Sequence, residues 1–134
     1  MKSFKIMAVA SAVVVMAASA ATSAFAHHSY AAFDRTKTVT ITGTVAEVEW
    51  TNPHTWVFVM VKGADGKTER WAVEGDPPGG MARAGWLRTS TKPGDKIELT
   101  INPMITGQLG GHYVTAVLPG NLQIGRHSDQ IAKP

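Results

Sequence analysis

The chain has 134 residues, with 13 lysine or arginine side chains, 10 aspartate or glutamate side chains and no cysteine. Without cysteine the fold can contain no disulfide, and a metal site would have to use nitrogen or oxygen ligands. The formal net charge is +3. Without Lys2 and Lys5 it falls to +1, so we expect no bulk attraction to nucleic acid or to an anionic membrane.

The first 26 residues have the features of a secretory signal peptide. Lys2 and Lys5 give a positive start, residues 6–21 are apolar or small, and small residues occupy both positions read by a signal peptidase before a cut after Ala26. The apolar stretch is too short, and too rich in alanine and serine, for a membrane anchor. We therefore expect a periplasmic or secreted protein with no stable anchor after cleavage. Its 108 residues would form one domain with a charge of +1.

The mature chain begins with an irregular stretch and continues with strands. Residues 27–36 show no clear period and are expected to form an N-terminal arm. A long strand is predicted over residues 37–50, where the apolar alternation slips once near Gly43, which indicates a bend or β-bulge there. An Asn-Pro turn then leads to a second strand over residues 54–62.

A tight turn and a break follow the second strand. The dipeptide Asp65-Gly66 favours a hairpin, so residues 68–74 should return antiparallel to the second strand. Proline and glycine then end the strand, and residues 81–87 are long enough for about two helical turns. Glu74 and Asp76 are expected to stabilise the start of this helix, with coordination of a ligand as the alternative.

The C-terminal half adds two more predicted strands, over residues 96–102 and 112–118. Three strands, one short helix and two strands form the order of a five-stranded Greek-key OB barrel. We therefore predict an all-β fold with one short helix, an OB-like barrel over residues 37–119, and a loosely ordered tail over residues 120–134. A small open sandwich with one helix is the alternative.

Short motifs along the mature chain resemble those of a family of exported bacterial proteins of unknown function, the DUF6152 family. They are His27-His28-Ser29 with Phe33-Asp34, Gly43-Thr44-Val45, Trp50-Thr51-Asn52-Pro53-His54, Asp65-Gly66, Gly85-Trp86 and Lys92-Pro93-Gly94-Asp95. They cover nearly the whole mature chain, and their order and spacing make the resemblance fairly specific. The resemblance implies an exported OB-like domain and no particular activity. His112 is not part of the pattern.

The predicted cleavage after Ala26 would create an unusual N-terminus. His27 would be the first residue, and its α-amine and ring nitrogen can chelate one metal ion. A further imidazole would complete a three-nitrogen set called a histidine brace, and nitrogen ligands favour copper. The candidate metal ligands are therefore His27, His28, His54 and His112. In the alternative interpretation, the N-terminal histidine pair is a solvated chain end.

Two histidines could complete such a site. His54 belongs to the family motif and is held by a proline turn, whereas His112 opens the last strand, on the side of the barrel where the arm is expected. An arm of ten residues can extend about 33 Å, so reach excludes neither. As a ligand, His54 should be partly exposed, with one ring nitrogen held by Asn52 or a turn carbonyl. As a structural residue, it should be buried between Trp50 and Trp56 with both ring nitrogens bonded.

A second hypothesis is a module without metal that binds a small ligand, a glycan or a protein across the second and third strands. Its candidate binding residues are Trp50, Asn52, Trp56 and Trp71. Aromatic residues of small barrels commonly fill the core, and burial of Trp56, Phe58 and Trp71 together would exclude such a platform. The sequence has no cysteine nucleophile, glycine-rich phosphate loop or His-Glu-x-x-His motif. We therefore expect a binding protein, with a metal ion or small ligand as its partner, and not an enzyme.

Overall fold

The computed structural model describes residues 30–125 of the chain. The chain divides into two compact units, Met1–Ala32 and Phe33–Pro134. Only residues 30–32 of the first unit are described, and all three are exposed. The predicted signal peptide and the histidine pair therefore lie outside the described residues. Within the described part of the chain, no helix is long and apolar enough to cross a membrane.

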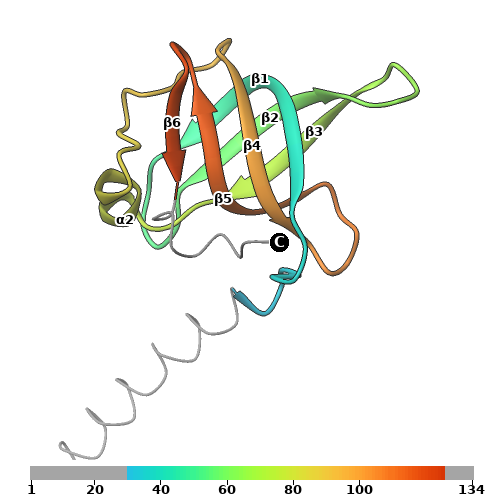
Figure 1. Cartoon of the computed structure of the whole chain (residues 1–134), viewed down its shortest axis with the longest axis horizontal. Helices are drawn as coiled ribbons and strands as arrows, with labels where there is room; N and C mark the ends of the chain where they lie inside the picture. The colour runs from blue at the N-terminus through green and yellow to red at the C-terminus, as the bar shows by residue number, and fades with distance from the viewer. Residues whose placement is uncertain (1–29, 126–134) are drawn as a thin grey trace, which may run out of the picture. The chain divides into compact units, whose positions relative to one another are not determined.

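The strands of the second unit form a closed barrel (Figure 1). In chain order they are β1 (Val39–Glu49), β2 (Trp56–Lys62), β3 (Thr68–Glu74), β4 (Lys96–Pro103), β5 (Gly110–Leu118) and β6 (Leu122–Gly125), with α2 (Pro78–Arg83) between β3 and β4. Neighbouring strands follow the order β3-β2-β1-β4-β5-β6, and a parallel pairing of β3 with β5 closes the first five strands into a barrel. This topology confirms the predicted all-β, OB-like barrel with one short helix.

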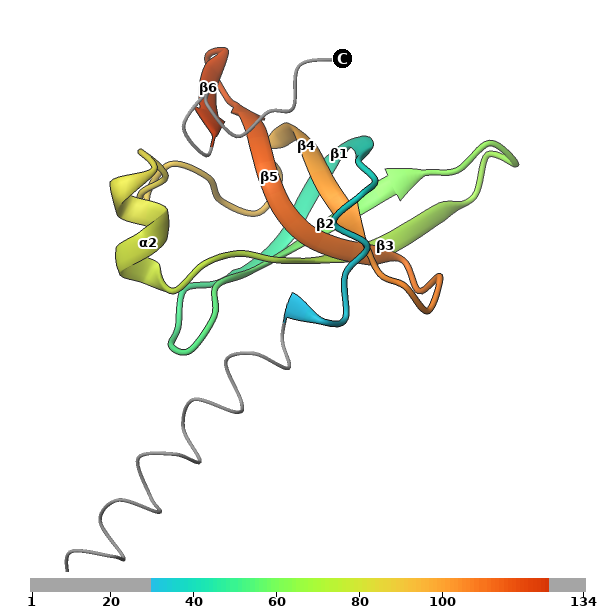
Figure 2. The same cartoon turned by 60° about the horizontal axis from the view of Figure 1, so that its bottom comes forward.

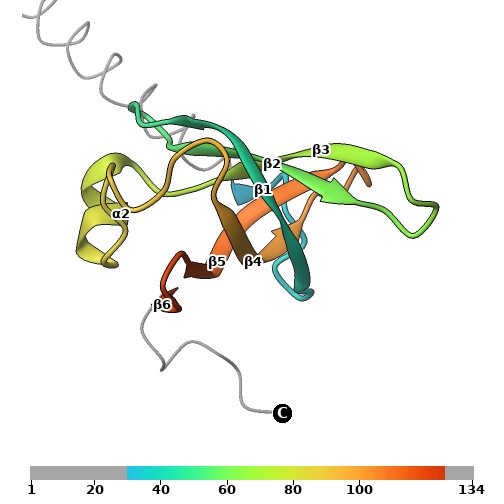
Figure 3. The ribbon, with the colours of Figure 1, turned by 90° about the horizontal axis from the view of Figure 1, so that it is seen from above.

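The barrel closes through β5, which pairs with β4 on one edge and with two different strands, β3 and β6, on the other edge. Its first residues, Gly110 to His112, pair with β3, and its last residues, Thr115 to Leu118, pair with β6. Figure 2 shows the strong curvature that carries β5 from one neighbour to the other. The β2–β3 hairpin and α2 lie at opposite ends of the barrel (Figure 3).

Inward-facing side chains of alternate strand residues fill the barrel. Val57 and Val59 of β2 and Leu99 of β4 are almost completely buried. The largest buried side chain is Trp86, which follows α2 and meets the ring of Tyr113 edge-on, with ring centroids 5.3 Å apart. The segment after α2 therefore contributes to the same core as the strands.

Gly43 does not carry the β-bulge that was predicted there as the alternative to a bend. Gly43 pairs in regular register with both β2 and β4, and the bulge of β1 falls between Val45 and Glu47. A Cβ atom on Gly43 would clash with the carbonyl oxygen of Met60, because β1 and β2 approach closely there. Glycine is therefore needed at this position for close approach, and the barrel closes although the pairing through residues 42–44 is unbroken.

The helix begins three residues earlier than predicted. It spans Pro78–Arg83 instead of residues 81–87. The first helical position suits Pro78, because the N–H that proline lacks would have no partner inside the helix at that position.

Part of the segment predicted to be a loosely ordered tail, Leu122–Gly125, forms β6, and residues 126–134 lie outside the described residues. The turn before β6 contains Gly120 and Asn121 with φ angles of 78° and 60°. Glycine and asparagine adopt this left-handed conformation most easily, and it allows a short hairpin between β5 and β6. The Gly-Asn dipeptide was therefore an overlooked hairpin signal.

Candidate functional site

The end of β3 lies between the start of β2 and the start of β5. Glu74 pairs with Trp56 on one side and with His112 on the other. The pairing of β2 with β3 continues beyond the strands, since the N–H of Gly75 donates to the carbonyl of Thr55 over 2.8 Å. These backbone contacts fix the segment that carries His54 against the segment from residue 74 to residue 76.

Both histidines of the barrel lie beside this segment. Nδ1 of His54 is 3.1 Å from Oε1 of Glu74, and Nε2 of His112 is 3.7 Å from Oδ1 of Asp76. The two histidines were predicted as alternative ligands, because His112 was expected near the arm and His54 at the far end of the first strand. The parallel β3–β5 pairing removes that separation, since it places the start of β5 directly beside the end of β3.

His54 is partly exposed and held through one ring nitrogen. Its side chain is 21% exposed, and Nδ1 also lies 3.3 Å from the carbonyl oxygen of Gly75. A carboxylate and a carbonyl can only accept, so Nδ1 carries the proton of the neutral ring and Nε2 keeps its lone pair. Among residues 30–125, Nε2 has no hydrogen-bond partner.

This environment differs from the structural role that was considered for His54. The ring is not buried with both nitrogens bonded inside the domain. Asn52, one of the two expected acceptors, is exposed in the turn. A carbonyl accepts as anticipated, although it belongs to Gly75 and not to the Asn-Pro turn. The carboxylate of Glu74 is an additional acceptor.

His112 is covered by the arm. Its side chain is only 4% exposed, and its ring lies 5.5 Å from the ring of Phe33, measured between centroids. Phe33 is itself buried and forms an isolated bridge with Met104. The N–H of Asp34 donates to the carbonyl of Pro103 over 2.8 Å. Phe33 and Asp34, near the end of the arm, are therefore fixed to the barrel, and His112 packs against Phe33.

A local turn secures the arm before β1. Lys37 Nζ lies 2.8 Å from Oδ2 of Asp34, and the hydroxyl of Thr36 donates to Oδ1 over 2.6 Å. The hydrogen bonds from Lys37 and Thr36 lower the pKa of Asp34 from 3.8 to about 2. Asn102 of β4 donates its side-chain N–H to the carbonyl of Lys37 over 2.7 Å, which ties the turn to the barrel.

The carboxylates before the helix have a different role from the one predicted. Residues of the first turn of α2 include no acidic side chain, and no side chain caps the helix start. Glu74 instead faces His54, and Asp76 faces His112. Within residues 30–125, no group of three or more histidine, aspartate or glutamate side chains is arranged so that it could hold a metal ion.

The aromatic residues that were candidates for ligand binding lie on two different faces of the sheet. Trp56 and Phe58 alternate with the buried valines of β2, so they point outward, and both are half-buried. Their rings are nearly parallel, at 17°, with centroids 6.3 Å apart. Trp50 and Trp71 instead pack against the core. The complete burial that would exclude an aromatic platform is not found, and Trp56 is the tryptophan that remains on the outer face.

A contact of two charged residues beside Phe58 was not predicted. Arg70 of β3 reaches across β2, where its guanidinium lies 4.3 Å from the centroid of the Phe58 ring. Its Nη2 atom then meets Oε2 of Glu47 on β1 at 2.8 Å. The register of the predicted Asp-Gly hairpin could have revealed this contact, because it sets Arg70 opposite Met60, one rung from Phe58.

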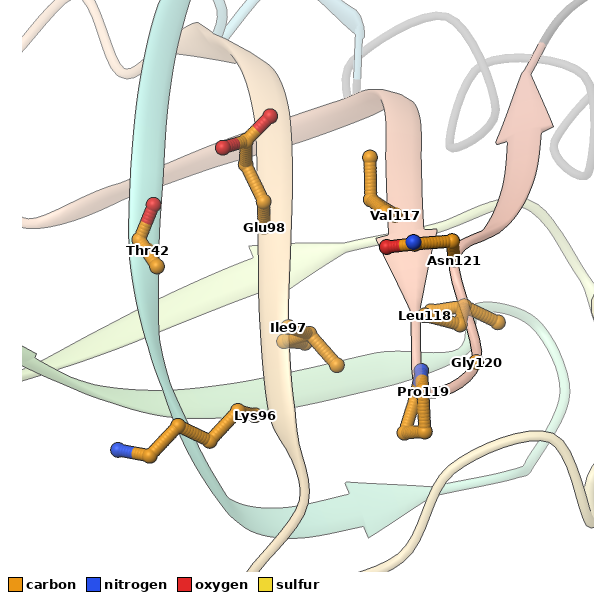
Figure 4. Close-up of a pocket in the computed structure, with 9 residues that line it drawn as sticks. All are labelled: Thr42, Lys96, Ile97, Glu98, Val117, Leu118, Pro119, Gly120 and Asn121. Carbon is orange, nitrogen blue, oxygen red and sulfur yellow. The ribbon is translucent and has the colours of Figure 1, made fainter.

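A separate hollow of about 310 Å³ lies where β1, β4 and the β5–β6 turn meet. Figure 4 shows its polar side chains, which are Thr42, Lys96, Glu98 and Asn121. None of the candidate residues from the sequence lines this hollow. It is therefore distinct from the His54 region.

The family comparison agrees with the motifs of the sequence. DUF6152, a family of unknown function, matches residues 14–113. The chain belongs to the DUF6152 family. The DUF6152 match includes His54 and His112 and ends at Tyr113, so most of β5 and all of β6 lie beyond it. No curated protein and no solved structure matches the chain. Membership of DUF6152 therefore confirms the predicted family and assigns no activity.

Proposed function

We propose that this DUF6152 protein is an exported binding module that holds one copper ion. The ligands are the α-amine and ring nitrogen of His27, exposed by cleavage after Ala26, together with Nε2 of His54. His28 lies next to the chelate and is the alternative source of the third nitrogen. The proposal joins the N-terminal chemistry predicted from the sequence to one imidazole of the barrel.

The geometry of His54 is the observation that carries the proposal. Histidines that ligate metals commonly donate their other ring N–H to a carboxylate or a backbone carbonyl, which fixes the ring and raises the basicity of the ligating nitrogen. His54 has both acceptors, Glu74 at 3.1 Å and Gly75 at 3.3 Å. Its partial exposure gives a ligand access to Nε2. His112 lacks this access, because its side chain is buried beneath Phe33.

The attachment of the arm limits where the proposed ligand set can lie. Phe33 is anchored on the barrel beside His112, whose strand partner is Glu74. Six residue steps separate His27 from Phe33 and span at most about 20 Å. The proposal therefore requires that Phe33 and the copper site lie within about 20 Å of each other.

Copper is the metal that this ligand set favours. The chain has no cysteine, so thiolate ligands are excluded. Sets of amine and imidazole nitrogens bind Cu²⁺ more tightly than the other divalent first-row metals, following the Irving–Williams order. We expect Zn²⁺ and Ni²⁺ to bind the same site more weakly.

A single added residue tests the proposal. Copper titrations would compare protein that begins at His27 with protein that carries one extra glycine before His27. The added residue keeps every histidine but moves the amine away from the His27 ring. Loss of a group that hydrogen-bonds to a metal ligand typically lowers the affinity for the metal roughly 10- to 100-fold. The added glycine displaces a ligand itself, so we expect it to lower the affinity for copper by more than this. Equal affinity of the two proteins would refute the proposal.

Substitution of His54 tests the barrel ligand separately. His54→Ala should weaken copper binding and leave the thermal unfolding of the metal-free protein nearly unchanged. His127→Ala, which removes a histidine of the C-terminal segment, is the matched control and should leave copper affinity unaltered. A lower melting temperature of the metal-free His54→Ala protein with unchanged copper affinity would assign His54 a structural role.

The second candidate function is binding of a non-metal ligand across β2 and β3. The observation that favours it is the outward position of Trp56 and Phe58 on β2. It is independent of the copper proposal, because neither ring belongs to the proposed ligand set.

A further inference from the structure

The outer face of the β1–β2–β3 sheet repeats one arrangement on two neighbouring rungs. On the first rung, Glu47 of β1 lies opposite Phe58 of β2. On the second rung, Glu49 lies opposite Trp56 in the same way. Each rung thus sets an aromatic ring beside a carboxylate of β1.

The first rung already holds a cation. The guanidinium of Arg70 lies 4.3 Å from the centroid of Phe58 and 2.8 Å, between nitrogen and oxygen, from Glu47. A guanidinium suits such a position, because its planar face stacks on an aromatic ring while its N–H groups meet a carboxylate.

The second rung has the same groups without a cation. Among residues 30–125, Glu49 makes no hydrogen bond or ion pair, and Trp56 has no cation over its ring. The planes of the two rings differ by only 17°, and their centroids lie 6.3 Å apart. Tryptophan binds a cation more strongly than phenylalanine does.

We propose that Trp56 and Glu49 form a binding site for an arginine side chain of a partner protein. The guanidinium would stack on Trp56 and pair with Glu49, as Arg70 stacks on Phe58 and pairs with Glu47. The charge of the site matches this occupant, since the exposed carboxylate of Glu49 lies opposite Trp56. The site does not involve His54 and does not depend on copper.

A pair of short peptides tests the inference. The probe is acetyl-Gly-Arg-Gly-amide, and its neutral control carries citrulline, which has nearly the same shape as arginine. Titrations would follow the indole N–H resonance of Trp56 by NMR. We expect the arginine peptide to shift this resonance with millimolar affinity and the citrulline peptide to leave it unchanged. Equal shifts from both peptides, or none from either, would overturn the proposal.

Two substitutions locate the site on the protein. Glu49→Gln should raise the dissociation constant of the arginine peptide about two- to fivefold, the range of an exposed ion pair. Glu98→Gln, which removes an exposed carboxylate of β4, is the control and should leave the constant unchanged. If Glu98→Gln weakens binding as much as Glu49→Gln does, the peptide responds to overall charge and the proposed site is wrong.

Discussion

Replacement of Gly43 by alanine should destabilise the barrel strongly. The added Cβ atom would lie 2.7 Å from Cγ1 of Val59 and would clash with the carbonyl oxygen of Met60. Carbon atoms in contact normally lie about 3.5–4.0 Å apart, so the strands would have to separate by roughly 1 Å. Such a shift is resisted, because Gly43 pairs with β2 on one side and β4 on the other.

The size of the effect follows from these contacts. Overpacking costs about 1–3 kcal/mol, and a weakened backbone hydrogen bond adds about 1 kcal/mol. We therefore expect Gly43→Ala to lower the free energy of unfolding by about 2–4 kcal/mol, out of the roughly 5–15 kcal/mol typical of a domain. The melting temperature should fall by about 10–25 °C.

Denaturant unfolding measures this change, with Gly79→Ala as the control. Gly79 lies in α2, and the nearest atom to its added Cβ is the flexible Nη1 of Arg83, at 3.5 Å. Alanine favours a helix over glycine, so this variant should be more stable by about 0.5–1 kcal/mol. If Gly43→Ala unfolds within about 0.5 kcal/mol of the unmodified protein, the close approach of β1 and β2 does not explain the glycine.

Three further predictions concern the core, the arm and the copper proposal. Trp86→Ala should lower the free energy of unfolding by about 3–5 kcal/mol in denaturant titrations, while the change at its exposed neighbour, Leu87→Ala, should stay near 0.5 kcal/mol. Because the pKa of Asp34 is about 2 when folded and 3.8 ordinarily, its contribution to stability is complete above about pH 4 and is lost as the pH falls towards 2. Asp34→Asn should therefore flatten the loss of stability in that pH range, and identical acid unfolding of both proteins would count against the Lys37 contact. Glu74→Gln should weaken copper binding about 10- to 100-fold by calorimetry, and unchanged affinity would show that the carboxylate does not support His54.

The strands were predictable because their signals are local. The β3 strand has the predicted bounds, since the Asp65-Gly66 turn fixes where the hairpin returns. The role of Gly43 was not predictable, because a glycine within a strand fits both a bulge and a close approach of backbones. Only the pairing on both sides of β1 distinguishes the two.

The two faces of β2 could not be told apart from the sequence. Trp56 and Phe58 alternate with Val57 and Val59, so both faces are apolar, and the pattern does not say which one faces inward. The structure places the valines in the core and the rings outside. The aromatic platform therefore remained an open hypothesis until the curvature of the barrel was known.

The contacts of His54 and His112 differ in how far they could be foreseen. The register of the predicted hairpin, extended beyond the strand ends, puts His54 beside the segment of Glu74 and Asp76. The position of His112 depends on the β3–β5 pairing, which joins residues far apart in the sequence and leaves no local pattern. The position of His54 beside Glu74 could thus be foreseen from the hairpin register. The position of His112 could be known only from the closed barrel.

The parallel closure also sets an order for folding. The β2–β3 hairpin connects neighbouring residues and can form within about 1–10 μs, so the contact between His54 and Glu74 can exist before the barrel does. The pairing of Glu74 with His112 spans about forty residues and requires a slow encounter of distant segments. Phe33 packs on His112, so the complete environment of Phe33 requires that slow encounter as well.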